Sequence, residues 1–140
     1  VSEITALITH EDDLRNLFRG RRTDLWEMAD VLADFGPEYV IIRTADWGFY
    51  VYDRVSRNRW IVPLYQTRVA DPTGAMDAFA GGFLVGYHKT YSPLEGALMG
   101  SVSASMVMEG SGPFYALDAM PELANLRLEA LRDMVQENPA

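Results

Sequence analysis

The sequence contains no cysteine, which excludes a disulfide framework and a thiolate metal site and is typical of a cytoplasmic protein. Basic residues are also scarce, since 12 Lys and Arg stand against 20 Asp and Glu, and the net charge is −8. This balance argues against a general nucleic-acid-binding surface. No apolar run approaches the roughly 18 residues that a membrane span needs. We therefore expect a cytoplasmic protein whose partners include neither nucleic acid nor a membrane.

Several common catalytic motifs are absent: the phosphate loop GxxxxGK[ST], the dinucleotide motif GxGxxG, the zinc motif HExxH and the nucleophile elbow GxSxG. The two histidines, His10 and His88, lie far apart without ligand spacing, and we interpret them as ordinary surface or core-edge residues. The RGRR run at residues 19–22 is interpreted as a solvated helix end, with a phosphate-binding patch as the alternative. Catalytic chemistry therefore has to come from another part of the sequence.

The length of 140 residues suits a single domain. The start at Val1 rather than at methionine leaves two interpretations, a fragment of a longer protein or only its ordered part. Residues 39–43, YVIIR, form a short apolar run that is typical of a strand buried on both faces. The spacing of apolar residues and the turn residues between them predict the other elements. We expect helices at 2–19 in two pieces, at 23–35 with Thr23 as the cap, at 75–89, at 94–109 and from Pro121 onward, and antiparallel strands at 49–52 and 59–63.

Two of these helical segments carry patterns that predict how they pack. The segment 94–109 has small residues along it, and the spacings Gly82–Gly86 and Gly96–Gly100 indicate close packing between helices. The last helix carries an apolar stripe, which we expect to face the core and which consists of Leu123, Leu126, Leu131 and Val135. Together with the strands, these helices predict an α/β protein.

The motif that stands out is residues 71–83, DPTGAMDAFAGGF. A turn-forming Asp-Pro-Thr-Gly stretch leads into an apolar helix with one carboxylate, Asp77, in its first turn. The first amide N–H groups of a helix have no intrahelical partner, and the helix dipole adds partial positive charge there. A glycine-containing turn before such a terminus is suited to holding an anion such as phosphate. We therefore interpret Gly74, Ala75, Met76 and Asp77 as a candidate anion site.

A carboxylate beside an anion site is repulsive unless a reacting group lies between the two. A substrate hydroxyl that attacks a phosphoryl group would meet this condition. The amides would stabilise charge on the phosphoryl oxygens, while Asp77 would orient the hydroxyl and accept its proton. The alternative is structural, with Asp77 complementing the helix dipole and the glycines serving as packing positions. The residues alone leave both interpretations open.

The same stretch resembles the second signature of the ribokinase-like (PfkB) carbohydrate kinases, D-[TPS]-[TS]-G-A-G-D-x-F-x-x-G. Residues 1–4, VSEI, resemble the end of the family's N-x-x-E motif, and residues 40–48, VIIRTADWG, resemble its strand leading to T-x-G-x-x-G, without the same glycine spacing. The resemblance covers essentially all of the chain but only about the C-terminal half of the family's fold. In the signature, Met76 replaces a glycine, and the matching residues are Asp71, Pro72, Thr73, Gly74, Ala75, Asp77, Phe79 and Gly82.

The resemblance implies a fold, a reaction and a set of site residues. The fold would be a three-layer αβα sandwich, with residues 1–140 as a single partial domain, the nucleotide-binding and catalytic half, made of parallel strands, a small antiparallel element and flanking helices. The reaction would be ATP-dependent phosphotransfer to a hydroxyl of a sugar or related small alcohol, with Mg²⁺ and, in many members, a monovalent cation such as K⁺. By resemblance, Asp77 is the catalytic base, and the anion hole consists of Gly74, Ala75, Met76 and Asp77. The resemblance also implies nucleotide contacts at Thr44, Gly48, Thr73 and Gly112. It places two acids, Glu3 and Asp71, on the side of the site where the metal ion binds.

Met76 keeps the backbone N–H of the glycine that it replaces but adds a side chain that must point away from the phosphate. If this position needed a positive φ, methionine would cost on the order of 1 kcal/mol or more. Two hypotheses follow. The protein is a working kinase with a reshaped site, or it is a catalytically weakened relative that binds nucleotide or sugar phosphate without efficient turnover.

In a further interpretation, the protein has no catalytic role and binds another protein chain through the open edge of its sheet. A homodimer is one such assembly. The residues that choose the sugar or alcohol belong, by the same resemblance, to the half of the fold that this sequence does not match. The substrate, the oligomeric state and the dependence on a monovalent cation are therefore open at the level of sequence.

Overall fold

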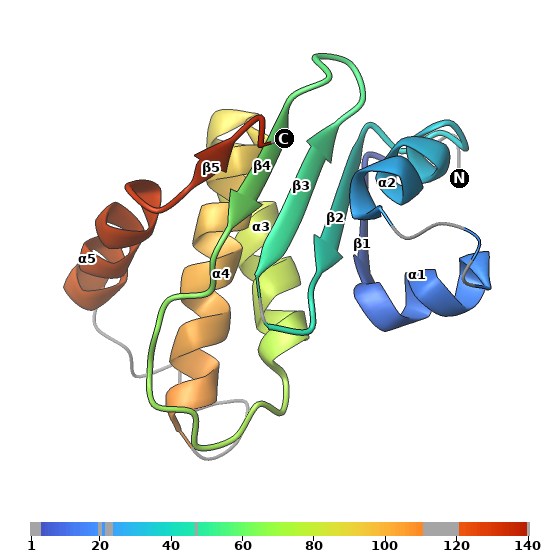
Figure 1. Ribbon diagram of the computed structural model, residues 1–140. Coiled ribbons are helices and arrows are strands. Elements are labelled where there is room, and N and C mark those ends of the chain that lie inside the picture. Colours follow the sequence, from blue (N-terminus) through green and yellow to red (C-terminus); the bar gives the residue numbers. More distant parts are fainter. Residues whose placement is uncertain (1–3, 20, 22–23, 47, 111–120, 140) are drawn as a thin grey trace. The chain divides into compact units, whose positions relative to one another are not determined.

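The computed structural model describes residues 4–19, 21, 24–46, 48–110 and 121–139 (Figure 1). These residues form five helices and a mixed sheet of five strands, which confirms the predicted α/β class. The chain divides into two compact units. Unit 1 comprises Val1–Ile61 with Gln136–Ala140, and unit 2 comprises Val62–Val135.

The sheet has the strand order β1-β2-β3-β4-β5. Strand β2 pairs in parallel with β1, where Ile8 lies opposite Ile41, and it pairs antiparallel with β3, where Ile41 lies opposite Val51. The predicted parallel element and the antiparallel element attached to it are therefore both present. The strands are β1 (Ala6–His10), β2 (Tyr39–Arg43), β3 (Phe49–Asp53), β4 (Arg59–Val62) and β5 (Gln136–Glu137).

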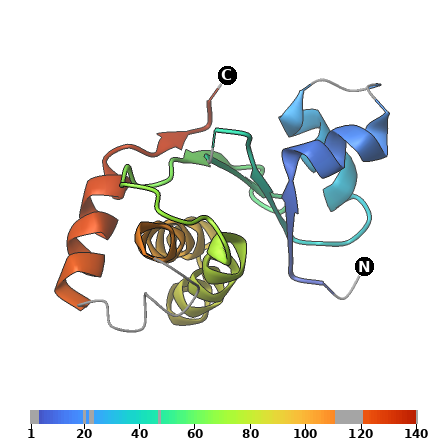
Figure 2. The same cartoon turned by 90° about the horizontal axis from the view of Figure 1, so that it is seen from below.

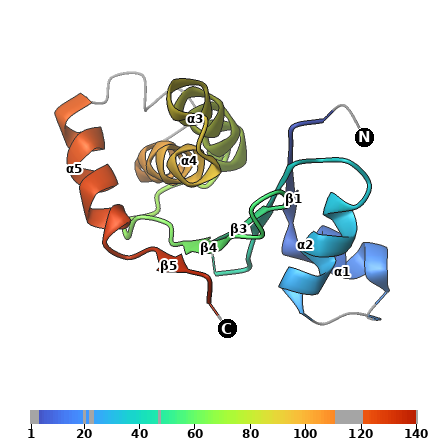
Figure 3. The same cartoon turned by 90° about the horizontal axis from the view of Figure 1, so that it is seen from above.

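Helices α1 (Glu11–Phe18) and α2 (Leu25–Ala33) lie on the same side of β1, as Figures 2 and 3 show from opposite directions. Successive residues of a strand point to opposite faces, so Val40 and Ile42 share the face that these helices cover. Ile41 points the other way and is also fully buried, as the continuous apolar run predicts. The core of unit 1 consists of Leu14, Leu25, Trp26, Met28, Ala29, Ala33, Val40, Ile42 and Tyr52.

The prediction of helix over residues 2–19 is wrong for its first piece, because Ala6–His10 form strand β1. The apolar residues Ile4, Leu7 and Ile8 have a spacing that also fits one face of a helix. Ile and Thr favour extended backbone only weakly, so pairing with β2 along the whole of β1 decides the outcome. The second piece is confirmed as α1, which begins where the Nδ1 atom of His10 accepts a hydrogen bond from the Asp12 amide at 3.0 Å.

Helix α2 begins one residue later than predicted. Asp24 is its N-cap, and its Oδ1 atom accepts a hydrogen bond from the Trp26 amide at 2.9 Å. Aspartate suits this position as well as threonine does, because either side chain supplies an oxygen to an amide that lacks a helical partner. The predicted cap, Thr23, lies outside the described residues.

Unit 2 contains α3 (Ala75–Thr90), α4 (Pro93–Glu109) and α5 (Pro121–Arg132), close to the predicted bounds. Helices α3 and α4 form an antiparallel pair, and Figure 2 shows them side by side. Their packing depends on glycine, as predicted, since a Cβ atom on Gly86 would lie 3.0 Å from the Cα atom of Gly96. A Cβ atom on Gly100 would likewise lie 2.7 Å from the carbonyl oxygen of Phe79. The two backbones therefore touch without intervening side chains.

The predicted apolar stripe of α5 is wrong in part. Leu131 is fully buried, but Leu123 is 41% and Leu126 is 70% exposed, and Val135 lies beyond the end of the helix at Arg132. Arg127, next to Leu126, is only 6% exposed. Arg127 turns inward because it pairs with the carboxylate of Glu109 on α4, a partner that periodicity within α5 cannot reveal. Within the described part of the chain, no helix combines the length and the apolar character of a membrane-spanning helix.

Candidate functional site

The turn before α3 is built from the residues of the Asp-Pro-Thr-Gly stretch. The Oδ1 atom of Asp71 accepts a hydrogen bond from the Thr73 amide at 3.0 Å, and the Pro72 carbonyl accepts one from the Ala75 amide at 3.1 Å. Gly74 is the N-cap of α3 with φ 82° and ψ 1°, a left-handed conformation that glycine adopts without the steric cost of a Cβ atom. The turn therefore ends in a residue that brings bare backbone to the start of the helix.

The start of α3 carries amide groups that the turn does not use. The first helical hydrogen bond runs from the Ala78 amide to the Gly74 carbonyl at 2.9 Å. The Ala75 amide is already bonded to Pro72, whereas the amides of Gly74, Met76 and Asp77 have no hydrogen-bond partner among the described residues. Three of the four predicted anion-hole amides thus lack a protein partner in this part of the chain.

The first turn of α3 separates buried from exposed side chains. Ala75 and Phe79 are buried, while Asp77 between them is exposed. Ala75 and Phe79 are one helical turn apart and share a face, so Asp77 lies on a different face. A solvent-accessible carboxylate and amides without described partners therefore occur at the same end of one helix. Such an arrangement is able to bind an anion and to accept a proton.

Met76 has helical backbone, and it is not among the residues with a positive φ. The left-handed conformation of this stretch falls on Gly74, two residues earlier. The backbone cost that a positive φ would impose on methionine therefore does not arise. The Met76 side chain is half-buried, and the backbone N–H remains at the helix start.

Thr44 and Gly48 belong to unit 1 and close the loop between β2 and β3. The Thr44 amide donates to the Gly48 carbonyl at 2.8 Å, and the Gly48 amide donates to the Thr44 Oγ1 atom at 3.1 Å. The Thr44 hydroxyl donates to the carboxylate of Asp46. This hydrogen bond, with help from the Gly48 amide, lowers the pKa of Asp46 although partial burial acts in the opposite direction. The loop is thus held internally by Thr44 and carries an ionised carboxylate.

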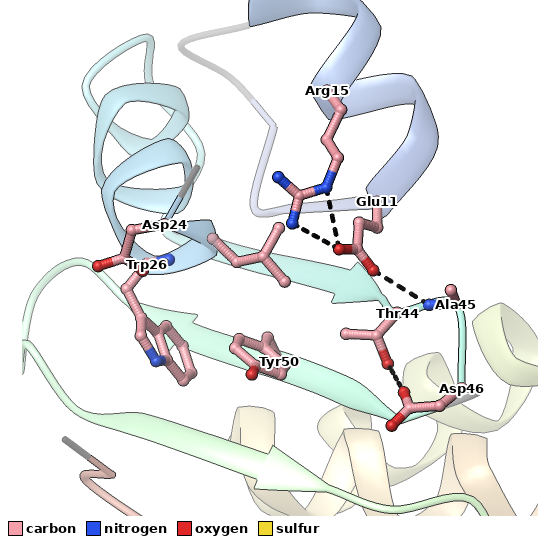
Figure 4. A pocket seen from close by; sticks show the side chains of 9 residues that line it. Glu11, Arg15, Asp24, Trp26, Thr44, Ala45, Asp46 and Tyr50 are labelled. Carbon is pink, nitrogen blue, oxygen red and sulfur yellow. Dashed lines mark hydrogen bonds and ion pairs between the residues drawn. The ribbon is translucent and has the colours of Figure 1, made fainter. Parts of the chain in front are cut away.

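The same loop lines an open cavity of about 610 Å³ in unit 1, together with α1, the start of α2 and Tyr50 of β3 (Figure 4). This volume lies within the roughly 300–1,000 Å³ that is typical of small-molecule sites. Along one wall, Glu11 accepts hydrogen bonds from Arg15 at 2.7 Å and from the Ala45 amide at 3.1 Å. Trp26 and Tyr50 also line the cavity, and the centres of their rings lie 4.6 Å apart.

The charge of this cavity is dominated by carboxylates. Burial raises the pKa of Glu11, but the hydrogen bonds from Arg15 and Ala45 and the attraction of the guanidinium outweigh it, so that the pKa lies below its ordinary value. Asp24 and Asp46 add two more acids to the lining. Glu11 and Arg15 are not among the site residues predicted from the sequence. Their spacing of four residues predicts an ion pair on a helix, but the pairing of β1 with β2 is what brings Glu11 to Ala45, 34 positions away.

The predicted metal-side and nucleotide residues are described only in part. Glu3 and Gly112 lie outside the described residues. Among the described residues, no group of three or more His, Cys, Asp or Glu side chains is placed to hold a metal ion. Mg²⁺ bound with phosphates usually takes one or two carboxylates and several waters, so a single acid such as Asp71 fits that chemistry. Thr73 is exposed in the turn, one residue from Gly74.

Comparison with known proteins identifies the family. A model of the pfkB family of carbohydrate kinases matches residues 1–120. The cytidine kinase of Thermococcus kodakarensis is 40% identical over 72 residues, which are 51% of this chain and 26% of that protein. The ribokinase of Thermotoga maritima superposes with a TM-score of 0.76 at 20% identity, over 91% of this chain and 43% of that one. The fructokinase of Vibrio cholerae, in a structure with fructose, ADP and calcium, superposes with a TM-score of 0.71 at 22% identity, over 89% of this chain and 41% of that one.

The structural neighbours confirm the ribokinase-like fold that the sequence motif implied. The chain spans about a quarter of the length of the cytidine kinase and about two fifths of the two solved structures. Because the family model covers most of its residues, the chain belongs to the pfkB family of carbohydrate kinases.

Proposed function

We propose that this chain is the nucleotide-binding, catalytic part of an ATP-dependent kinase that phosphorylates a hydroxyl of a sugar or related small alcohol. One observation carries the proposal. Asp77 is exposed in the first turn of α3, where the amides of Gly74, Met76 and Asp77 have no partner among the described residues. Phosphoryl transfer needs a group that orients the hydroxyl and donors that stabilise the phosphoryl oxygens.

In the proposed reaction, the amides at the start of α3 bind oxygens of the γ-phosphoryl group. The carboxylate of Asp77 orients the substrate hydroxyl and accepts its proton as the new oxygen–phosphorus bond forms. The bond between the γ-phosphorus and its bridging oxygen breaks at the same time, and ADP leaves. Mg²⁺ supplies positive charge to the phosphates when bound, and Asp71 and Glu3 are the proposed acids on that side.

The helical backbone of Met76 supports a working kinase over a weakened relative. A helical residue at the second position of α3 directs its N–H out of the helix end, as glycine would, so the substitution retains the donor. The second candidate is a protein that binds nucleotide or sugar phosphate with little turnover. It is favoured by the side chain that Met76 adds where the family motif has glycine. Met76 is half-buried, which leaves part of its side chain at the surface of the first turn.

The comparisons support the class of substrate. The relatives named above are a cytidine kinase, a ribokinase and a fructokinase, and the fructokinase structure contains fructose and ADP. We propose that this chain likewise takes a nucleoside triphosphate and a small polyhydroxylated acceptor. Thr44, Gly48, Thr73 and Gly112 are the proposed nucleotide contacts.

The experiment is a phosphotransfer assay on the natural full-length polypeptide that contains these residues. ADP release and ³¹P NMR of the product are followed across a panel of sugars and nucleosides, with ATP and Mg²⁺. We expect turnover with at least one acceptor and a loss of about 10²–10⁴-fold in kcat for Asp77→Asn, which keeps the shape but removes the base. The control is Glu122→Gln, an exposed acid in the first turn of α5, which should change kcat less than twofold. Unchanged turnover in Asp77→Asn would exclude the proposed role.

A further inference from the structure

Unit 2 buries an arginine, Arg127 of α5, at 6% exposure. Its Nη1 atom donates to the Ser105 hydroxyl at 3.0 Å, and its Nη2 atom donates to the carboxylate of Glu109. The guanidinium lies 4.8 Å from the ring centre of Tyr65, while its Nε atom has no hydrogen-bond partner in the described part of the chain. A buried cation is costly unless it is paired, and a buried pair often contributes less to stability than apolar residues of the same volume. The question is therefore what this arginine does besides filling space.

Glu109 links Arg127 to a second segment. It is the last residue of α4, and its carboxylate also accepts a hydrogen bond from the hydroxyl of Thr67. Thr67 lies in the stretch without regular secondary structure that leads from β4 to the turn before α3. The other end of that stretch is tied to the same helix, because the Ser101 hydroxyl donates to the Pro63 carbonyl at 2.7 Å. Helix α4 therefore holds the stretch at both ends.

The residue before Glu109 continues the connection toward the anion site. The carbonyl of Met108 accepts hydrogen bonds from the amides of Ala70 at 2.7 Å and Asp71 at 3.2 Å. Asp71 in turn fixes the turn through its bond to the Thr73 amide. An unbroken series of hydrogen bonds and covalent bonds thus runs from the guanidinium of Arg127, through Glu109 and the end of α4, to the amides at the start of α3.

We propose that Arg127, acting through Glu109, is a positioning residue that sets the Asp71–Asp77 turn for phosphoryl transfer. Arg127 itself touches none of the reacting groups. It holds the carboxylate of Glu109 in the orientation that receives Thr67, four residues before Asp71. A site of backbone amides depends on such support, because each donor must stay within roughly 0.5 Å of its productive position. This inference rests on the proposed function of the same turn.

The chain offers a matched control on the same two helices. Arg132 of α5 pairs with Glu95 of α4, with its Nη2 atom 3.1 Å from the Glu95 Oε2 atom, but this pair is partly exposed and lies at the other end of α4. Arg132→Met therefore removes an arginine–glutamate pair between α5 and α4 without touching the stretch before the turn. Arg127→Met removes the arginine–glutamate pair that does contact this stretch. Arg127→Lys keeps the charge but not the paired donors that reach Ser105 and Glu109.

The first measurement separates kcat from KM in the full-length polypeptide, well below the unfolding temperature of each variant. We expect Arg127→Met to lower kcat by about 10²-fold, since a displacement of about 1 Å at the reacting groups has an effect of that size. Arg127→Lys should fall between Arg127→Met and the unaltered protein, and Arg132→Met should stay within twofold of it. If Arg127→Met lowers only the unfolding temperature and the folded protein keeps its kcat, the arginine is merely structural and the proposal is wrong.

The second measurement needs no turnover and therefore separates this proposal from the proposed function. The amide ¹H–¹⁵N resonances of Gly74, Met76 and Asp77 are followed in the same full-length polypeptide, without ligand and with added inorganic phosphate. Arg127→Met should shift these resonances and weaken their response to phosphate, whereas Arg132→Met should leave both unchanged. If Arg127→Met does not fold, Thr67→Val tests the same link, because it removes the hydroxyl but keeps the shape and the Arg127–Glu109 pair. Unshifted resonances in a folded Arg127→Met or Thr67→Val protein would overturn the proposal.

Discussion

Gly82 of α3 lies so close to Gly100 of α4 that a Cβ atom on Gly82 would stand 2.9 Å from the Cα atom of Gly100. The same atom would stand 2.7 Å from the carbonyl oxygen of Met99. Both obstacles are backbone atoms, which cannot rotate away as a side chain can. The contact therefore sets the distance between α4 and the helix that carries Asp77.

Gly82→Ala should destabilise unit 2 by about 1–3 kcal/mol, because the added methyl group forces the two helices apart. The matched control is Gly81→Ala, one position earlier, where a Cβ atom would meet no described atom within 4 Å. That variant should stabilise the protein by about 0.5–1 kcal/mol, since alanine favours the helix over glycine. Urea unfolding of the two variants measures both effects. Equal stability of the two variants would contradict the close packing.

Asp71 has two separable roles, one in the turn and one in the proposed metal-side charge. Asp71→Asn keeps an oxygen able to accept from the Thr73 amide but removes the negative charge. We expect it to unfold at nearly the same urea concentration as the unaltered protein and to need several times more Mg²⁺ for half-maximal turnover. Asp71→Ala should in addition lose about 1–3 kcal/mol of stability, because the turn loses a charge-assisted hydrogen bond. A normal Mg²⁺ requirement in Asp71→Asn would limit Asp71 to the turn.

Met76→Gly restores the residue that the family motif carries at this position. Because Met76 already has helical backbone, the change should not switch on an inactive site, and kcat should change by less than about tenfold. Glycine inside the first turn should cost about 0.5–1 kcal/mol of stability. Turnover of the sugar and nucleoside panel, measured beside unfolding, tests both statements. Turnover in Met76→Gly where the natural sequence has none would establish the weakened relative and exclude the working kinase.

The pH dependence of stability should reflect Glu109. Burial raises the pKa of Glu109, but the hydrogen bonds from Thr67 and Arg127 and the attraction of the guanidinium lower it more, so that the folded-state pKa lies below the ordinary value of 4.5. A carboxyl group with a lowered folded-state pKa stabilises the protein above its unfolded-state pKa, and this stability is lost as the pH falls through the folded-state value.

The measurement is the free energy of unfolding between pH 7 and pH 3 for the unaltered protein and for Glu109→Gln. The unaltered protein should be more stable at neutral pH, and the difference between the two should shrink toward the acid end. Glu122→Gln, which replaces an exposed acid, should follow the unaltered protein throughout. A difference that is independent of pH would mean that ionisation of Glu109 does not contribute.

The local features of the candidate site follow from residues that are neighbours in the sequence. The Asp-Pro-Thr-Gly stretch and the apolar residues after it predicted a turn and a helix start, and α3 begins at Ala75. The strand at 39–43 was equally clear, because a continuous apolar run between turn residues suits few other structures. Such features depend on residues that are close in the chain, so composition and spacing suffice.

The partners of the ambiguous segments, by contrast, depend on long-range contacts in the folded chain. Ala6–His10 became a strand because β2 lies beside it, although its apolar spacing also fits a helix. Arg127 turned inward and Leu126 outward because Glu109 lies on a neighbouring helix, 18 positions away in the chain. A hydrogen bond or an ion pair between distant residues outweighs a local preference of a few tenths of a kcal/mol. Periodicity within one segment contains no information about such a partner, so the fold alone could reveal it.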